Sequence, residues 1–165
     1  RFDGFADACR NALQTVIEIV EPSLLLRIGL RYCDLVTTEN NEQFSQLVDE
    51  KFIPTTTTQS LGSTRHLKTE NYIKTHTGTL CIRSWFGVMP LTCPPDIDNV
   101  PVQIVRDQAA TERLILDFDH IWEAGEESVT FALEQALTRL DALHEASRAA
   151  FWQVTTDYAR ETKWS

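Results

Sequence analysis

The sequence predicts an α+β fold, in which an antiparallel sheet of four or five strands carries a long C-terminal helix on one face. Residues 23–35 and 112–121 alternate apolar with mixed positions, as strands with one buried face do. Residues 66–75 and 79–86 alternate on either side of Thr77 and Gly78, which indicates a hairpin. Residues 128–161 hold one apolar stripe at helical spacing. A helix-grip arrangement, with a ligand groove between helix and sheet, is the architectural alternative.

The chain begins with an amphipathic helix, because apolar residues recur three and four positions apart until Glu21 and Pro22 interrupt the pattern. The strand that follows has apolar residues at every even position from Leu24 to Tyr32. We expect this apolar face to lie against the long helix. The same position is expected for the apolar face of the later strand, which consists of Leu114, Leu116 and Phe118. Between these strands, residues 44–52 predict a short helix that ends before Pro54.

Four prolines between Pro90 and Pro101 indicate an irregular loop, and residues 102–105 predict a further short strand. The C-terminal stripe is long: an unbroken helix over residues 128–161 would measure about 51 Å at ~1.5 Å per residue. A compact domain of this size is only about 40 Å across. Either the helix bends near Val154–Thr156, or it projects and packs against another copy. We therefore expect a homo-oligomer whose contact includes the helix between Leu140 and Tyr158.

The composition limits the classes of partner. With 165 residues, of which 42% are hydrophobic, the chain is long enough for one well-filled core. The net charge of −9 argues against binding to nucleic acid or to an anionic membrane surface. No apolar run reaches the ~18 residues of a membrane span. The four cysteines lack C-x-x-C spacing, so we expect reduced thiols and a cytoplasmic location.

One polar site is predicted on the face of the sheet opposite to the long helix. Arg27 and Arg31 share that face of the first strand, and Asp117 and Asp119 share it on the later strand. Guanidinium groups suit an anion or a partner's carboxylates, whereas the more frequent arrangement is internal pairing with acids on a neighbouring strand. We expect at least one Arg–Asp contact across this face, with Arg31 as the donor.

A catalytic alternative combines the two aspartates with His144, which lies on the apolar stripe of the helix. Carboxylates roughly 7 Å apart on one strand face can share a metal ion or divide acid and base roles. The ordinary interpretation of His144 is a partly buried histidine with local hydrogen bonds. No G-x-S-x-G, H-E-x-x-H, P-loop or G-x-G-x-x-G motif occurs, which favours a non-enzymatic role without metal or cofactor.

Three short segments resemble a sporadically distributed, uncharacterised prokaryotic protein family. Arg27–Tyr32 resembles its R-I-G-L-R-Y strand, Leu116–Asp119 its L-D-x-D strand, and Leu143–Glu145 its L-H-E helix. Cys33 and Asp34 stand where the family usually has Ile and Asn. The resemblance implies a bacterial cytoplasmic setting and brings no known activity. Length and composition favour a single α+β domain over residues 1–165, and the resemblance implies that this domain is the C-terminal part of a longer protein.

Three functions remain open at this point. The first is a non-catalytic interaction or assembly module that forms a homo-oligomer or binds a protein partner. The second is a small-ligand-binding protein that uses the groove between helix and sheet. The third is a metal-assisted hydrolase built on Asp117, Asp119 and His144. The candidate binding residues are Arg27, Arg31, Asp117, Asp119 and His144, and no catalytic residue is assigned.

Overall fold

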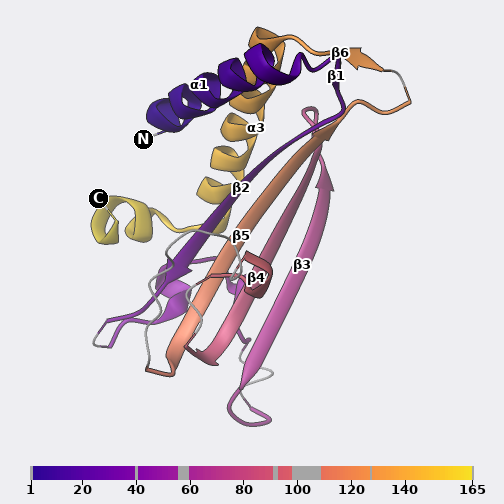
Figure 1. Cartoon of the computed structure of the whole chain (residues 1–165). Helices are drawn as coiled ribbons and strands as arrows, with labels where there is room; N and C mark the ends of the chain where they lie inside the picture. Colours follow the sequence, from indigo (N-terminus) through magenta and orange to yellow (C-terminus); the bar gives the residue numbers. More distant parts are fainter. Residues whose placement is uncertain are drawn as a thin grey trace.

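The computed structural model describes residues 2–39, 41–55, 60–90, 93–97, 109–126 and 128–164. Its main sheet has four antiparallel strands in the order β2 (Arg27–Val36), β5 (Thr111–Glu123), β4 (Thr79–Met89) and β3 (His66–Lys74). A separate two-stranded sheet pairs β1 (Leu24–Leu25) with β6 (Val129–Thr130). Helix α1 (Phe2–Val20) packs on α3 (Leu133–Val154), and α3 packs on β2 and β5, so both helices lie on one side of the sheet (Figure 1). The predicted α+β class is confirmed.

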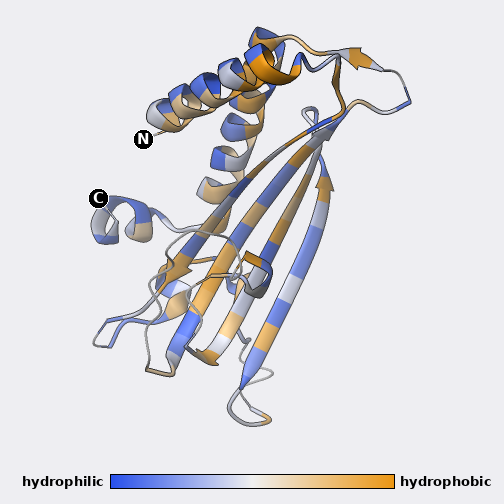
Figure 2. Cartoon of the chain, viewed as in Figure 1, coloured by the Kyte–Doolittle hydropathy of each residue, from blue (hydrophilic) through white to orange (hydrophobic). Residues whose placement is uncertain are grey.

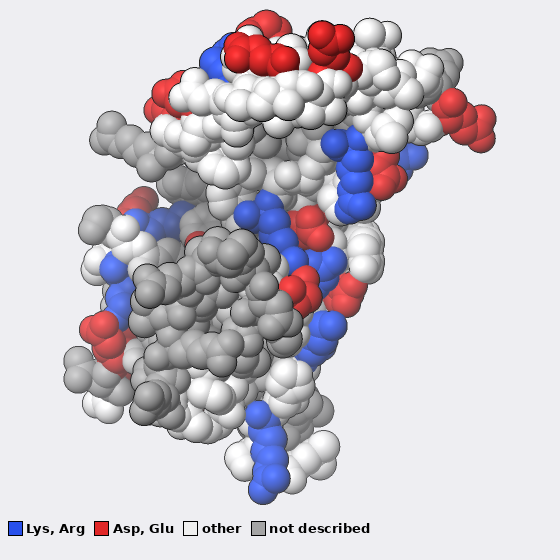
Figure 3. Space-filling model, in the orientation of Figure 1, with Lys and Arg blue, Asp and Glu red and all other residues white. Residues whose placement is uncertain are grey.

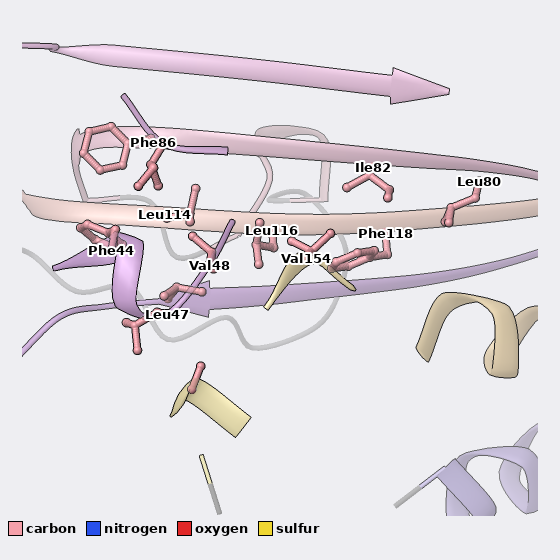
Figure 4. Close-up of a cluster of buried hydrophobic side chains, with 13 residues drawn as sticks. Phe44, Leu47, Val48, Leu80, Ile82, Phe86, Leu114, Leu116, Phe118 and Val154 are labelled. Atoms are coloured by element: carbon pink, nitrogen blue, oxygen red, sulfur yellow. The ribbon is translucent and has the colours of Figure 1, made fainter. Parts of the chain in front are cut away.

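Two apolar clusters hold the helices and the turns on the sheet. The larger lies between β5, β4 and the segment around Phe44, and it includes Leu80, Ile82, Phe86, Leu114, Leu116 and Phe118 (Figure 4). The smaller joins β2 to α3, and it consists of Leu30, Leu137, Leu140 and Leu143 with Phe2, Cys9 and Leu13 of α1 packed against it. The apolar and polar bands that alternate along the strands are visible in Figure 2. This alternation is why one face of the sheet can be buried by helices.

The predicted hairpin is confirmed, and its turn depends on a glycine. Strands β3 and β4 pair along their length, and the Thr75 amide donates to the Gly78 carbonyl oxygen at 2.8 Å. Gly78 has a φ of +154°, and a Cβ on it would lie 2.1 Å from the carbonyl oxygen of Ile121. Only a residue without a side chain fits this close approach to β5.

The prediction of one continuous strand from Ser23 is wrong. The chain breaks at Leu26, so that Leu24 and Leu25 pair with β6 while β2 starts at Arg27. Leu24 and Leu26 are 48% and 63% exposed, and Leu25 is buried instead. The even-position face therefore meets the helices only from Ile28 onward. Pairing with β6, which lies more than a hundred residues away, decides the orientation of this segment.

The predicted C-terminal helix is also shorter than its apolar stripe. Val129 belongs to β6, and α3 spans 22 residues, about 33 Å at ~1.5 Å per residue. The helix ends because Thr155 forms a bridge with Val48 and the Asp49 amide donates to the Val154 carbonyl oxygen at 2.8 Å. A short helix, η4 (Ala159–Lys163), follows. The chain bends at the predicted site, and its length no longer argues for packing against another copy.

The remaining segments give smaller corrections. Two 3-10 turns, Phe44–Gln46 and Glu50–Phe52, replace the predicted short helix, although Phe44 is buried as expected. The predicted strand at residues 102–105 lies outside the described residues. Cys9, Cys33 and Cys81 are free thiols, as predicted. Among the described helices, none is long and apolar enough to cross a membrane.

Candidate functional site

The buried carboxylate of Asp117 is the centre of an ion-pair cluster on the face of the sheet opposite to the helices. Strand β5 lies between β2 and β4, and the register places Cys33 and Arg83 on either side of Asp117. Arg31 donates to both Asp117 oxygens, from Nε at 2.7 Å and from Nη2 at 2.8 Å. Arg83 donates from Nη1 to Oδ2 at 3.0 Å. The predicted Arg–Asp contact is therefore confirmed, with Arg31 as the donor.

The cluster extends outward to Asp119, which the sequence indicated, and to Asp96 and Glu70, which it did not. Arg31 also makes two hydrogen bonds to Asp96, at 2.6 and 3.0 Å. Arg83 reaches Asp119 at 3.4 Å and Glu70 at 3.7 Å. Figure 3 shows positive and negative side chains next to one another over the sheet. Hydrogen bonds that Arg31 donates to Asp96 and, with the next largest effect, to Asp117 hold the pKa of Arg31 above its usual range. The arrangement is that of internal pairing.

Arg27 stands apart from this cluster. It lies opposite Glu123 at the start of β2, where the closest approach of the two charged groups is 3.8 Å and both side chains are largely exposed. Cys33 does contact Asp117, with Sγ to Oδ1 at 3.5 Å. Burial, with the nearby Asp117 charge, raises the pKa of Cys33 to about 12. The thiol is therefore protonated at neutral pH.

His144 lies on the other side of the sheet. Its Nδ1 is 2.7 Å from the Tyr32 hydroxyl, and its ring stacks on Phe2 with a centroid distance of 3.7 Å. Tyr32 alternates with Arg31 along β2, so the sheet separates His144 from Asp117 and Asp119. In the described ranges, no group of three His, Cys, Asp or Glu residues is arranged to hold a metal ion. The arrangement that the hydrolase hypothesis requires is not formed.

A second histidine, His120, joins the hairpin turn to the helix in a buried cluster. Its Nδ1 donates to the Leu143 carbonyl oxygen at 3.2 Å, because a carbonyl can only accept. Its Nε2 lies 3.0 Å from the Thr75 hydroxyl and 3.1 Å from the Thr77 hydroxyl. Burial lowers the pKa of His120, so the ring is neutral at neutral pH. The one sequence signal for this cluster is the alternation of β5, which places His120 on the helix side of the sheet.

Three neighbouring cavities follow β2 along its outer edge. The first, of about 460 Å³, touches Leu30, Arg31 and Tyr32 and is closed by Phe2, Phe5 and His144. The second, of about 190 Å³, lies between Tyr32, Asp34 and α3. The third, of about 380 Å³, touches Asp34, Leu35 and Val36 and is lined by Phe151, Trp152, Arg160 and Trp164. A groove between helix and sheet, as in the helix-grip alternative, is therefore present beside β2.

Comparison of the chain with protein-family models, with curated proteins and with solved structures finds no match. The resemblance of Arg27–Tyr32 to an uncharacterised prokaryotic family therefore stays a prediction. Any functional conclusion has to rest on the geometry of the chain itself.

Proposed function

We propose that this chain is a non-catalytic assembly module that self-associates through α1, in the prokaryotic cytoplasmic setting that the sequence resemblance implies. The observation that carries the proposal is the exposure of α1. It is a helix of 19 residues with a marked apolar side, yet none of its residues is buried. A helix that leaves its apolar side in water gains most of its stability only when a second surface covers that side.

The apolar side of α1 is wider than the contact it makes with α3. Phe2, Cys9 and Leu13 pack on the smaller core cluster, and Arg10 pairs with Glu134 of α3. The rest of the apolar side is exposed, and it consists of Phe5 at 48%, Val16 at 42%, Ile19 at 76% and Val20 at 66%. We call these four residues the outer stripe. In Figure 3, an uncharged band runs along α1 beside a row of acidic side chains.

A second copy is the occupant that fits this stripe best. The outer stripe is flanked on α1 by acids and one arginine. When two copies associate, their identical stripes would bury apolar groups against each other. Each fully buried Val, Ile or Phe side chain contributes roughly 1.5–3 kcal/mol, and contiguous exposed apolar surface of this kind commonly marks an interface. This surface replaces the contact between Leu140 and Tyr158 expected from the sequence, since Leu140, Leu143 and Val154 pack inside the same chain.

The test is a mass measurement in solution on a matched pair of variants. Light scattering coupled to gel filtration at about 10 to 200 µM should give a dimer or larger species for the native chain. The double variant V16E/I19E should be monomeric, with an unchanged circular dichroism spectrum. Leu61→Glu is the matched control, because Leu61 is 87% exposed and lies far along the chain from α1. A monomeric native chain, or a V16E/I19E variant with the native mass, would contradict the proposal.

The small-ligand alternative keeps one supporting observation, which is the groove beside β2. The guanidinium group of Arg31 does not converge on a ligand there, because it is engaged by Asp117 and Asp96. The groove is long and open instead of compact, and this shape points to a different kind of ligand.

A further inference from the structure

Strand β2 is an edge strand, and no strand in the described part of the chain pairs with its outer side. In the main sheet it pairs with β5 alone, and within the described residues no other strand lies against it. An unpaired strand presents a row of backbone N–H and C=O groups that can pair with an added strand. The opposite edge, β3, is guarded by charged and exposed residues, which are His66, Lys68, Glu70 and Lys74. Charged side chains of this kind discourage strand addition.

The cavities along β2 have the shape of an extended chain. They touch consecutive residues, Leu30–Tyr32 in one cavity and Asp34–Val36 in another, so they follow the backbone edge and not one face of the strand. The distance from Leu30 to Val36 is roughly 20 Å at ~3.3 Å per residue. A drug-sized molecule is normally held in one concave pocket, whereas this length matches about six or seven residues of extended peptide.

Aromatic side chains line the groove at both ends. Phe2 and Phe5 of α1 stand at one end, and Phe151 of α3 and Trp164 lie near the other, with ring centroids 5.9 Å apart. Tyr32 forms the middle, where its hydroxyl is fixed by the 2.7 Å contact to His144. Side chains of an added strand that point to the helix side would therefore meet apolar surface at alternate positions.

Asp34 gives this groove a charge that none of the described side chains neutralises. Its carboxylate borders two of the cavities, and among the described residues it makes no hydrogen bond and no ion pair. Arg148 lines the same cavity, but its ion pair is with Glu145 at 3.8 Å. Arg160 donates to the Trp152 carbonyl oxygen at 2.8 Å. Burial raises the pKa of Asp34, because the carboxylate lacks a cation to stabilise its charge.

We propose that the outer edge of β2 binds an extended segment of a partner protein by strand addition, with a Lys or Arg side chain of that segment paired to Asp34. Apolar side chains would stand two positions on either side of the cation, facing Tyr32 and Phe151. Main-chain hydrogen bonds to β2 would supply affinity, and the alternate side chains would supply specificity. This interaction shares Phe5 with the outer stripe of α1, but it does not involve Val16, Ile19 or Val20.

The experiment is a selection from a phage-displayed library of random twelve-residue peptides against the native chain. Recovered peptides should share a Lys or Arg flanked by apolar residues two positions away. A synthetic consensus peptide should bind Asp34→Asn about tenfold or more weakly, as expected for losing a charge-assisted hydrogen bond. The matched control is Asp141→Asn, because Asp141 is an exposed acid of α3 that lines none of the three cavities. Its affinity should be native.

Backbone hydrogen exchange separates strand addition from other modes of binding. The peptide should slow amide exchange between Leu30 and Val36, and N-methylation of alternate peptide amides should abolish binding. Recovery of no common pattern, recovery of a pattern without a cation, or native affinity of Asp34→Asn would overturn the proposal. Concentration-dependent protection of β2 without any peptide would also overturn it, because a second copy would then occupy the edge.

Discussion

Substitution of Asp117 should destabilise the fold more than any other single change in the ion-pair cluster. Its carboxylate is fully buried and accepts three N–H donors from Arg31 and Arg83, whose side chains are only 23% and 18% exposed. In Asp117→Ala, both guanidinium groups remain partly buried without that carboxylate. Breaking a buried pair in this way costs about 3–5 kcal/mol, and the lower end applies here because Arg31 keeps Asp96.

Two single arginine variants and one triple variant serve as comparisons for the loss of stability in Asp117→Ala. Arg31→Ala leaves Asp117 with Arg83 and should cost about 1–3 kcal/mol. Arg27→Ala breaks only the exposed contact with Glu123 and should cost roughly 0–1 kcal/mol. Replacing the three charges together, as R31M/R83M/D117L, should be close to neutral, since apolar side chains often substitute for buried ion pairs.

The assay is urea unfolding at pH 7, followed by far-ultraviolet circular dichroism and by tryptophan fluorescence. A loss of less than about 1 kcal/mol in Asp117→Ala, or a loss equal to that in Arg27→Ala, would refute the reasoning. Such a result would mean that water satisfies the two guanidinium groups, and that the cluster is open to an outside anion.

Three further predictions concern single residues. Burial lowers the folded-state pKa of His120, so the unfolded state binds the proton more tightly and stability should fall as pH drops below about 6.5. Thermal unfolding between pH 7.5 and pH 4.5 should show a smaller loss of stability in His120→Gln than in the native chain. Gly78→Ala places its Cβ 2.1 Å from the Ile121 carbonyl oxygen and should cost about 2 kcal/mol or more in urea unfolding, whereas Gly4→Ala, with nothing within 4 Å, should stabilise α1 by up to about 1 kcal/mol. Asp34→Asn should stabilise the chain by about 0.5 kcal/mol at pH 7. The pKa of the native Asp34 carboxyl is raised, so the native chain loses stability as pH rises and this carboxyl ionises. An equal gain at pH 3, where the native carboxyl is protonated, would contradict this cause.

The alternation of residues was sufficient to predict which side chains share a face. It placed Arg31 and Asp117 on one side of the sheet and Tyr32 with Phe118 on the other, and the structure confirms both placements. The reason is physical: a period of two leaves no freedom once one face is committed to the core. Because β2 and β5 are neighbouring strands, residues on the same face of both can meet, and Arg31 contacts Asp117.

Pairing between distant segments could not be predicted in the same way. Arg83 belongs to the cluster because β4 pairs with the side of β5 that faces away from β2. The alternation of residues within one strand does not predict the order of the strands in the sheet. Asp96 reached Arg31 from a proline-rich loop that has no periodicity. Likewise, α3 ends at Val154 because Val48 pairs with Thr155, although the apolar stripe continues beyond it.

Two aspartates on neighbouring strands show why the polar cluster and the groove are assigned different roles. Asp34 pairs with Leu116, and Asp117 is the next residue along β5, so the two aspartates lie on opposite faces of the sheet. Three N–H donors from the same chain bind the Asp117 carboxylate. Asp34 has none of these partners and loses hydration all the same, which opposes folding. A saturated carboxylate stabilises the fold and leaves little for a ligand to bind, whereas an unsatisfied one is stabilised only by a cation from outside. The candidate binding surface is therefore the edge of β2, where Asp34 lies, and not the cluster of charges that is most conspicuous in the sequence.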